Sequence, residues 1–100
     1  MKNILIAALI LSSTPVWAGA MGELWSTTNL SVRETLGYEA KIVSIEQKFA
    51  PVPGFELAVK STVYGYNQAN EVVPTFECIS GYRESNAGSY QLIGTDCQAL

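Results

Sequence analysis

Hydrophobic and polar residues alternate most regularly between positions 55 and 66. Four apolar side chains share one face of an extended chain there: Phe55, Leu57, Val59 and Val63. The other face is mostly polar, with Glu56, Lys60 and Thr62, and it continues through Tyr64 and Tyr66. A period of two predicts a β-strand that buries one side.

A second run, residues 41–49, is rich in β-branched residues and places Val43, Ile45 and Phe49 on one face. The sequence Pro-Val-Pro-Gly at positions 51–54 separates the two runs. Proline fixes φ and glycine allows positive φ, so this segment predicts a tight turn. The two runs are therefore expected to form an antiparallel hairpin.

Residues 72–83 and 90–97 predict a second hairpin around the turn-forming cluster at 84–89, and Pro74 predicts an edge position for its first strand. Cys78 and Cys97 are equally far from the centre of this turn, so they are expected to lie directly opposite each other. A four-residue loop, 86–89, would make them a non-hydrogen-bonded pair, where Cα atoms approach to about 4.5 Å. That separation suits a disulfide, which the even cysteine count also favours.

The same register divides the second hairpin into two apolar faces. One carries Phe76, Cys78, Tyr82, Ile93 and Cys97, and the other carries Ile79, Tyr90 and Leu92. An antiparallel sheet exposed on one side should have a polar outer face, so the N-terminal segment or a partner is expected to cover the second face.

Within residues 22–37, the sequence Ser-Val-Arg-Glu at 31–34 resembles a capping box and predicts a short helix over 31–36, ended by Gly37. A longer helix over 32–43 is the alternative. The expected fold is thus α+β and mostly β. It is a four-stranded antiparallel sheet of two hairpins, with a short N-terminal helix or segment on one face and one disulfide.

The first twenty residues have the order of a signal peptide: Lys2, an eight-residue apolar run at 4–11, Pro15, and small residues at Ala18 and Ala20. The run is too short for a bilayer span of about 20 residues. We expect cleavage after Ala18, with a cut after Ala20 as the alternative. Residues 19–100 would form one small periplasmic or secreted domain, with no stable membrane insertion.

Charge and chemistry exclude several classes of function. Without residues 1–18 the chain keeps five basic and nine acidic residues, a net charge of −4, which argues against nucleic acid as a partner. It has no histidine, no glycine-rich phosphate loop and no calcium-loop pattern. We therefore expect neither a metal nor a cofactor, and no enzymatic activity, since two carboxylates in a deep cleft are the only route left open.

Exposed aromatic residues remain as candidates for function. Tyr64 and Tyr66, with Lys60 and Glu56 on the same face, predict a protein-binding surface, because tyrosine provides large contact area at low entropic cost. The alternative is that both tyrosines pack beneath the N-terminal segment. The expected function is an exported binding protein, an inhibitor or immunity-type protein acting on an envelope enzyme or toxin. An assembly subunit of a surface complex and a small sugar-binding module are the alternatives; the sequence leaves the oligomeric state open.

Overall fold

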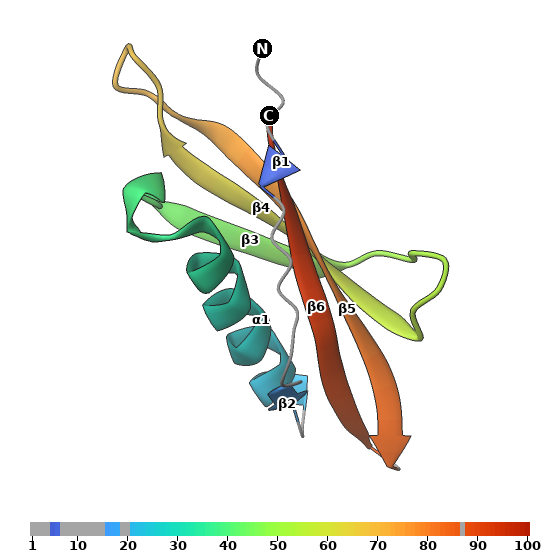
Figure 1. The fold of residues 1–100 in the computed structure, drawn as a ribbon. Helices are drawn as coiled ribbons and strands as arrows, with labels where there is room; N and C mark the ends of the chain where they lie inside the picture. Colours follow the sequence, from blue (N-terminus) through green and yellow to red (C-terminus); the bar gives the residue numbers. More distant parts are fainter. Residues whose placement is uncertain (1–4, 7–15, 19–20, 87) are drawn as a thin grey trace.

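The computed structural model describes residues 5–6, 16–18, 21–86 and 88–100, and shows an antiparallel sheet with one helix across it (Figure 1). The elements are β1 (Leu5–Ile6), β2 (Val16–Ala18), α1 (Met21–Leu36), the 3₁₀ turn η1 (Tyr38–Ala40), β3 (Ser44–Phe49), β4 (Leu57–Tyr66), β5 (Val72–Asn86) and β6 (Ser89–Ala99). The sheet order is β1-β6-β5-β4-β3, and β2 also pairs with β6. The predicted four-stranded sheet, β3 to β6, is confirmed.

Helix α1 is longer than predicted, because it begins at Met21 rather than Ser31. Three side chains four residues apart, Leu24, Thr28 and Val32, are fully buried against the sheet. The middle one is a threonine, so the sequence does not display the apolar stripe of an amphipathic helix. The capping box does not form, and Ser31 Oγ lies 2.6 Å from Thr95 Oγ1 instead.

The end of the helix is as predicted, and the alternative helix over 32–43 is wrong. Gly37 has a φ of 83° and its N–H donates to the carbonyl oxygen of Arg33 at 2.9 Å. Glycine adopts this left-handed conformation without steric cost, so it terminates the helix where the chain turns toward β3.

The core consists of two apolar clusters with a layer of hydroxyl groups between them. Leu24, Val59, Tyr82 and Leu92 form one cluster, and Val32, Val63, Cys78 and Cys97 form the other. On α1, β4, β5 and β6, a buried Ser or Thr lies between the two clusters: Thr28, Ser61, Ser80 and Thr95. Thr95 Oγ1 lies 2.8 Å from Ser80 Oγ, and Thr28 Oγ1 lies 2.5 Å from the Tyr82 hydroxyl. These contacts satisfy groups that would otherwise be costly to bury, whereas the buried Ser61 Oγ has no hydrogen-bond partner among the described residues.

The buried hydroxyl of Tyr82 leads to a pH prediction. Burial raises the pKa of Tyr82 above its ordinary value of 10.0, while the hydrogen bond with Thr28 acts in the opposite direction. The unfolded chain therefore ionises first, and the stabilisation present below about pH 10 is lost as pH rises toward the folded-state pKa. Wild-type protein should lose stability between about pH 9 and pH 11 more steeply than Tyr82→Phe. Urea unfolding at each pH measures this, and equal slopes would contradict it; Tyr38→Phe, at a 97 % exposed residue, should behave as wild type.

Two irregularities in the β5–β6 ladder change which side chains share a face. Gly81 pairs with Gly94 but Tyr82 pairs with Leu92, so Ile93 is an extra residue on β6 and is exposed. The prediction that Tyr90 and Leu92 lie opposite the Cys78 face is therefore wrong, because both pack on the Tyr82 cluster beneath α1. A second shift, at Ser85, restores the register of the Gly81–Gly94 pair, so that Asn86 pairs with Ser89 before the turn.

Three further expectations about β4 and β5 need correction. Asn86 pairs with Ser89, so the loop is shorter than the predicted 86–89. Strand β5 is central rather than an edge strand, and Pro74 is tolerated because the ladder with β6 begins only at Phe76. Phe55 precedes β4 and lies outside the core, with its ring over the outer face of β5 at Gly81.

The contact between Phe55 and Gly81 predicts a stability effect. A Cβ added at Gly81 would clash with the Phe55 ring, so Gly81→Ala should cost about 1–3 kcal/mol of unfolding free energy. Gly94, directly opposite in the ladder, has no heavy atom near its Cβ position, and Gly94→Ala is the matched control. Chemical denaturation of both variants measures the difference. If Gly81→Ala costs as much in a Phe55→Ala background as in wild type, the ring is not the cause.

Candidate functional site

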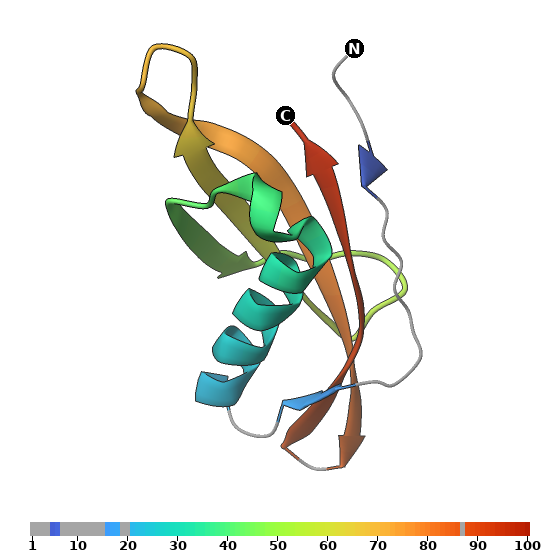
Figure 2. The ribbon, with the colours of Figure 1, turned by 60° about the vertical axis from the view of Figure 1, so that its left-hand side comes forward.

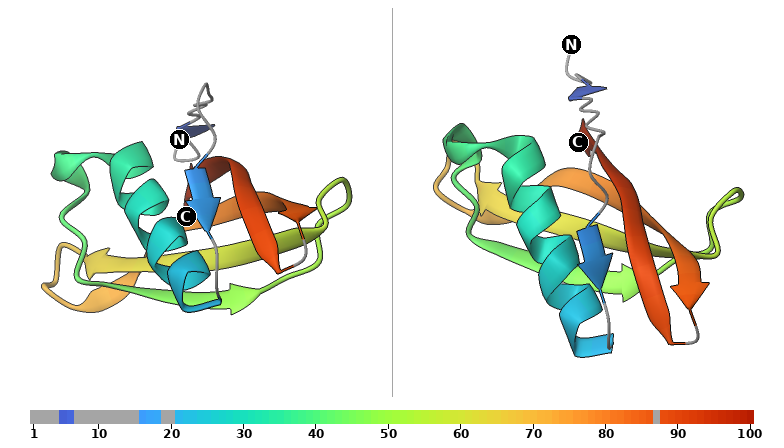
Figure 3. Two further views of the ribbon diagram at one scale, coloured as in Figure 1. Left: turned by 90° about the horizontal axis from the view of Figure 1, so that it is seen from below. Right: turned by 60° about the horizontal axis from the view of Figure 1, so that its bottom comes forward.

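The face of the sheet opposite α1 is the candidate binding surface. Helix α1 covers only one side of the sheet (Figure 3), and among the described residues only the loop between β3 and β4 folds onto the other side. This outer face carries the alternate residues of β3 and β4, including Glu46, Lys48, Lys60, Thr62 and Tyr64. It is therefore accessible, as the sequence predicted for the face of β4 that contains the tyrosines.

Tyr64 and Tyr66 occupy the end of β4 near the turn to β5. The Tyr64 hydroxyl donates to Glu46 Oε1 at 3.0 Å, and this hydrogen bond to a carboxylate raises the pKa of Tyr64 above its ordinary value. Tyr66 is 60 % exposed. Val63, their neighbour in β4, packs on Val32 of α1, so alternation places Tyr64 on the face away from the helix. The alternative that the tyrosines pack beneath the N-terminal segment does not hold.

Lys60 lies at the centre of the outer face. It stands opposite Lys48 across the β3–β4 ladder, and its Nζ is 2.7 Å from Glu77 Oε2 on β5. Like charges directly opposite each other are unfavourable, and the carboxylate of Glu77 offsets the repulsion between Lys48 and Lys60. Both partners of the ion pair are about one third exposed, so it contributes at most about 1 kcal/mol.

Glu56 is not part of the same cluster. Its Oε1 accepts a hydrogen bond from the backbone N–H of Glu84 at the far end of the sheet. Ten residues of strand separate it from Tyr66, about 33 Å at 3.3 Å per residue. The structure therefore groups Tyr64 and Tyr66 at one end and Lys60 in the middle, with Glu56 beside the β3–β4 loop.

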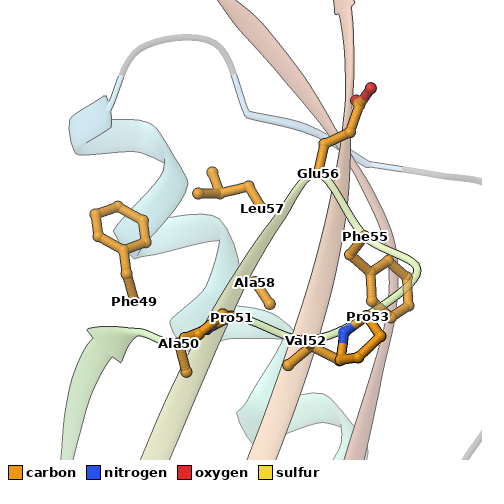
Figure 4. Close-up of a pocket in the computed structure, with 9 residues that line it drawn as sticks. All are labelled: Phe49, Ala50, Pro51, Val52, Pro53, Phe55, Glu56, Leu57 and Ala58. Carbon is orange, nitrogen blue, oxygen red and sulfur yellow. The ribbon is translucent and has the colours of Figure 1, made fainter.

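The β3–β4 loop forms an apolar pocket that the sequence reasoning treated only as a turn. The volume of the pocket is about 480 Å³. All residues from Phe49 to Ala58 except Gly54 line it (Figure 4). Phe49 is 45 % exposed and its ring centroid lies 4.7 Å from that of Trp25. The available signal was composition: residues 49–55 contain no charged or hydrogen-bonding side chain, whereas surface turns are usually polar.

The remaining features concern chemistry and membranes. Within the described part of the chain, no three His, Cys, Asp or Glu side chains are grouped so that they could hold a metal ion. No helix formed by these residues is long and apolar enough to cross a membrane. The disulfide between Cys78 and Cys97 is formed, and it is compatible with an oxidising compartment.

Comparison of the chain with models of known protein families, with curated proteins and with solved structures finds no match.

Proposed function

We propose that the chain is a small exported binding protein that acts as an inhibitor or immunity-type protein on an envelope enzyme or toxin. The observation that carries this proposal is the outer face of the sheet, where the half-buried Tyr64 and the exposed Tyr66 lie among charged residues of both signs. Interfaces concentrate their energy in aromatic anchors surrounded by polar groups. A partner that covers the Tyr64 end would meet both kinds of contact.

Export is supported by two independent features. The N-terminus has the order of a signal peptide, with Lys2, an apolar run and small residues at 18 and 20. The buried disulfide is compatible with an oxidising compartment, where such bonds form and persist. The processed protein would begin at Gly19 or Met21, as intact mass of exported material would show.

Tyr64→Ala is expected to weaken binding of the partner about thirtyfold and to leave folding intact. The side chain is half-buried and its hydrogen bond to Glu46 is exposed, so its removal should change the unfolding midpoint little. The wild-type protein would first be used to capture its partner from an envelope extract. Affinities of Tyr64→Ala and Tyr66→Ala for that partner would then be measured by calorimetry, together with thermal melts.

Tyr38→Ala is the matched control, because Tyr38 is 97 % exposed on η1, outside the strands of this face. Unchanged affinity in both Tyr64→Ala and Tyr66→Ala would reject the outer face as the binding surface. The apolar loop at 49–55 would then be tested in the same assay with Phe49→Ser. Binding of a glycan array instead of a protein would favour the sugar-binding alternative.

A further inference from the structure

We infer that the edge of β6 that faces away from β5 is the site where the exported protein binds a second copy of itself, β6 against β6. This inference rests on the proposed export, because the edge becomes available when residues 1–18 are removed. The two copies would form one continuous sheet around a twofold axis.

The edge of β6 is covered in the full chain by the two segments predicted to leave with the signal peptide. Strand β1 pairs with β6 at Cys97 and Gln98, and β2 pairs with it at residues 90–92, both antiparallel (Figure 2). An extended antiparallel strand therefore fits this edge. Cleavage after Ala18 removes both strands and leaves the N–H and C=O groups of β6 without a strand partner, which makes an edge prone to pairing.

The backbone at Cys97 is oriented to pair across this edge. The Cα atoms of Cys78 and Cys97 are 4.0 Å apart, which is the short spacing of a non-hydrogen-bonded pair. In such a pair the N–H and C=O groups point away from the partner strand, here away from β5 and toward the free edge. Two copies of Cys97 facing each other across a twofold axis would exchange both hydrogen bonds.

Side chains on β6 are compatible with this register. Asp96 is the only charged residue between Ser89 and Ala99, whereas β3, the other edge strand, carries Glu46 and Lys48 within six residues. Edge strands usually carry charges that discourage pairing, and β6 carries few. A register centred on Cys97 places Asp96 opposite Gln98 of the second copy, and both side chains are exposed on the outer face. The Gln98 amide can donate to the Asp96 carboxylate twice in each dimer.

The register predicts opposite effects of charge at position 98. Gln98→Asp would place two carboxylates opposite each other in each of two symmetric pairs, and the dimer dissociation constant should rise about tenfold. Gln98→Lys would pair with Asp96 and lower that constant. In Gln98→Asp, the further change Asp96→Lys restores opposite charges and should restore dimerisation. Gln68→Asp, in the exposed turn after β4, is the control for charge alone.

The experiment is sedimentation equilibrium of the protein exported from cells that express the full chain, with intact mass identifying its N-terminus. Dimers that weaken in Gln98→Asp, strengthen in Gln98→Lys and recover in the double variant support the inference. A processed protein that stays monomeric, or dimerises without regard to the charge at 98, overturns it while leaving export intact. A protein that retains residues 1–18 overturns the export proposal, and the inference with it, because β6 stays covered.

Discussion

Replacing Tyr82 by alanine is expected to lower the free energy of unfolding by about 3–5 kcal/mol. Among the side chains whose burial the structure describes, Tyr82 is the largest that is fully buried, and it packs with Leu24, Val59 and Leu92 where α1 crosses the sheet. Its removal leaves a cavity and takes away one of the two partners of the Thr28 hydroxyl, which also donates to the Leu24 carbonyl oxygen. A domain of this size has about 5–15 kcal/mol in total, so the variant should approach the limit of folding at ambient temperature.

Urea denaturation followed by tryptophan fluorescence measures this loss. Tyr82→Phe keeps the ring and removes only the hydroxyl, so it should cost about 1–2 kcal/mol and separate packing from hydrogen bonding. Tyr38→Ala, at a surface position, should stay within about 0.5 kcal/mol of wild type. A loss below about 1.5 kcal/mol in Tyr82→Ala would show that α1 does not pack on the sheet as described.

Cys78→Ala is expected to lower the free energy of unfolding by about 2–4 kcal/mol, chiefly because the unfolded chain loses a constraint. The two cysteines are 19 positions apart, and the bond joins the middle of β5 to the C-terminal part of β6. Both are fully buried in the cluster with Val32 and Val63, so reducing agents reach the bond only when the structure opens. Denaturation midpoints with and without reductant measure the contribution.

The double variant Cys78→Ala/Cys97→Ala is the matched control for a lone buried thiol. It should lose about as much stability as the single variant, because either change opens the same loop. Reduced wild type should fall in the same range. Free thiols in oxidised protein, or a midpoint unchanged by both substitutions, would show that the bond does not stabilise the domain.

The hairpins and the disulfide were predictable because they depend on local properties of the chain. In a strand successive side chains point to opposite faces, so alternation at 55–66 indicates a strand whatever lies next to it. The distances of Cys78 and Cys97 from one turn define their pairing in the same way. The predicted loop length was wrong because the ladder between the turn and the disulfide contains two irregularities. Ser85 is an extra residue on β5 and Ile93 is an extra residue on β6, so the two shifts in register cancel each other.

The candidate site was predictable only in part. Tyr64, Tyr66 and Lys60 lie on the outer face as their alternation indicates, because helix α1 binds the opposite face. Glu56 is separated from the tyrosines because consecutive same-face residues spread along a strand instead of converging. The apolar loop at 49–55 was missed, since turn chemistry explains its prolines and glycine without reference to what its side chains contact.

The sequence by itself determined the strands, the positions of the turns between them, the end of the helix at Gly37 and the pairing of the cysteines. Tertiary structure decided where α1 begins, which hydroxyls are buried and which face Tyr90 and Leu92 occupy. The physical reason is that no local pattern encodes the contact of the Thr28 hydroxyl with the Tyr82 hydroxyl, 54 residues away, although its hydrogen bond to the Leu24 carbonyl oxygen is local. A buried polar residue costs less when it is hydrogen-bonded, and tertiary contacts decide whether the fold supplies the partner.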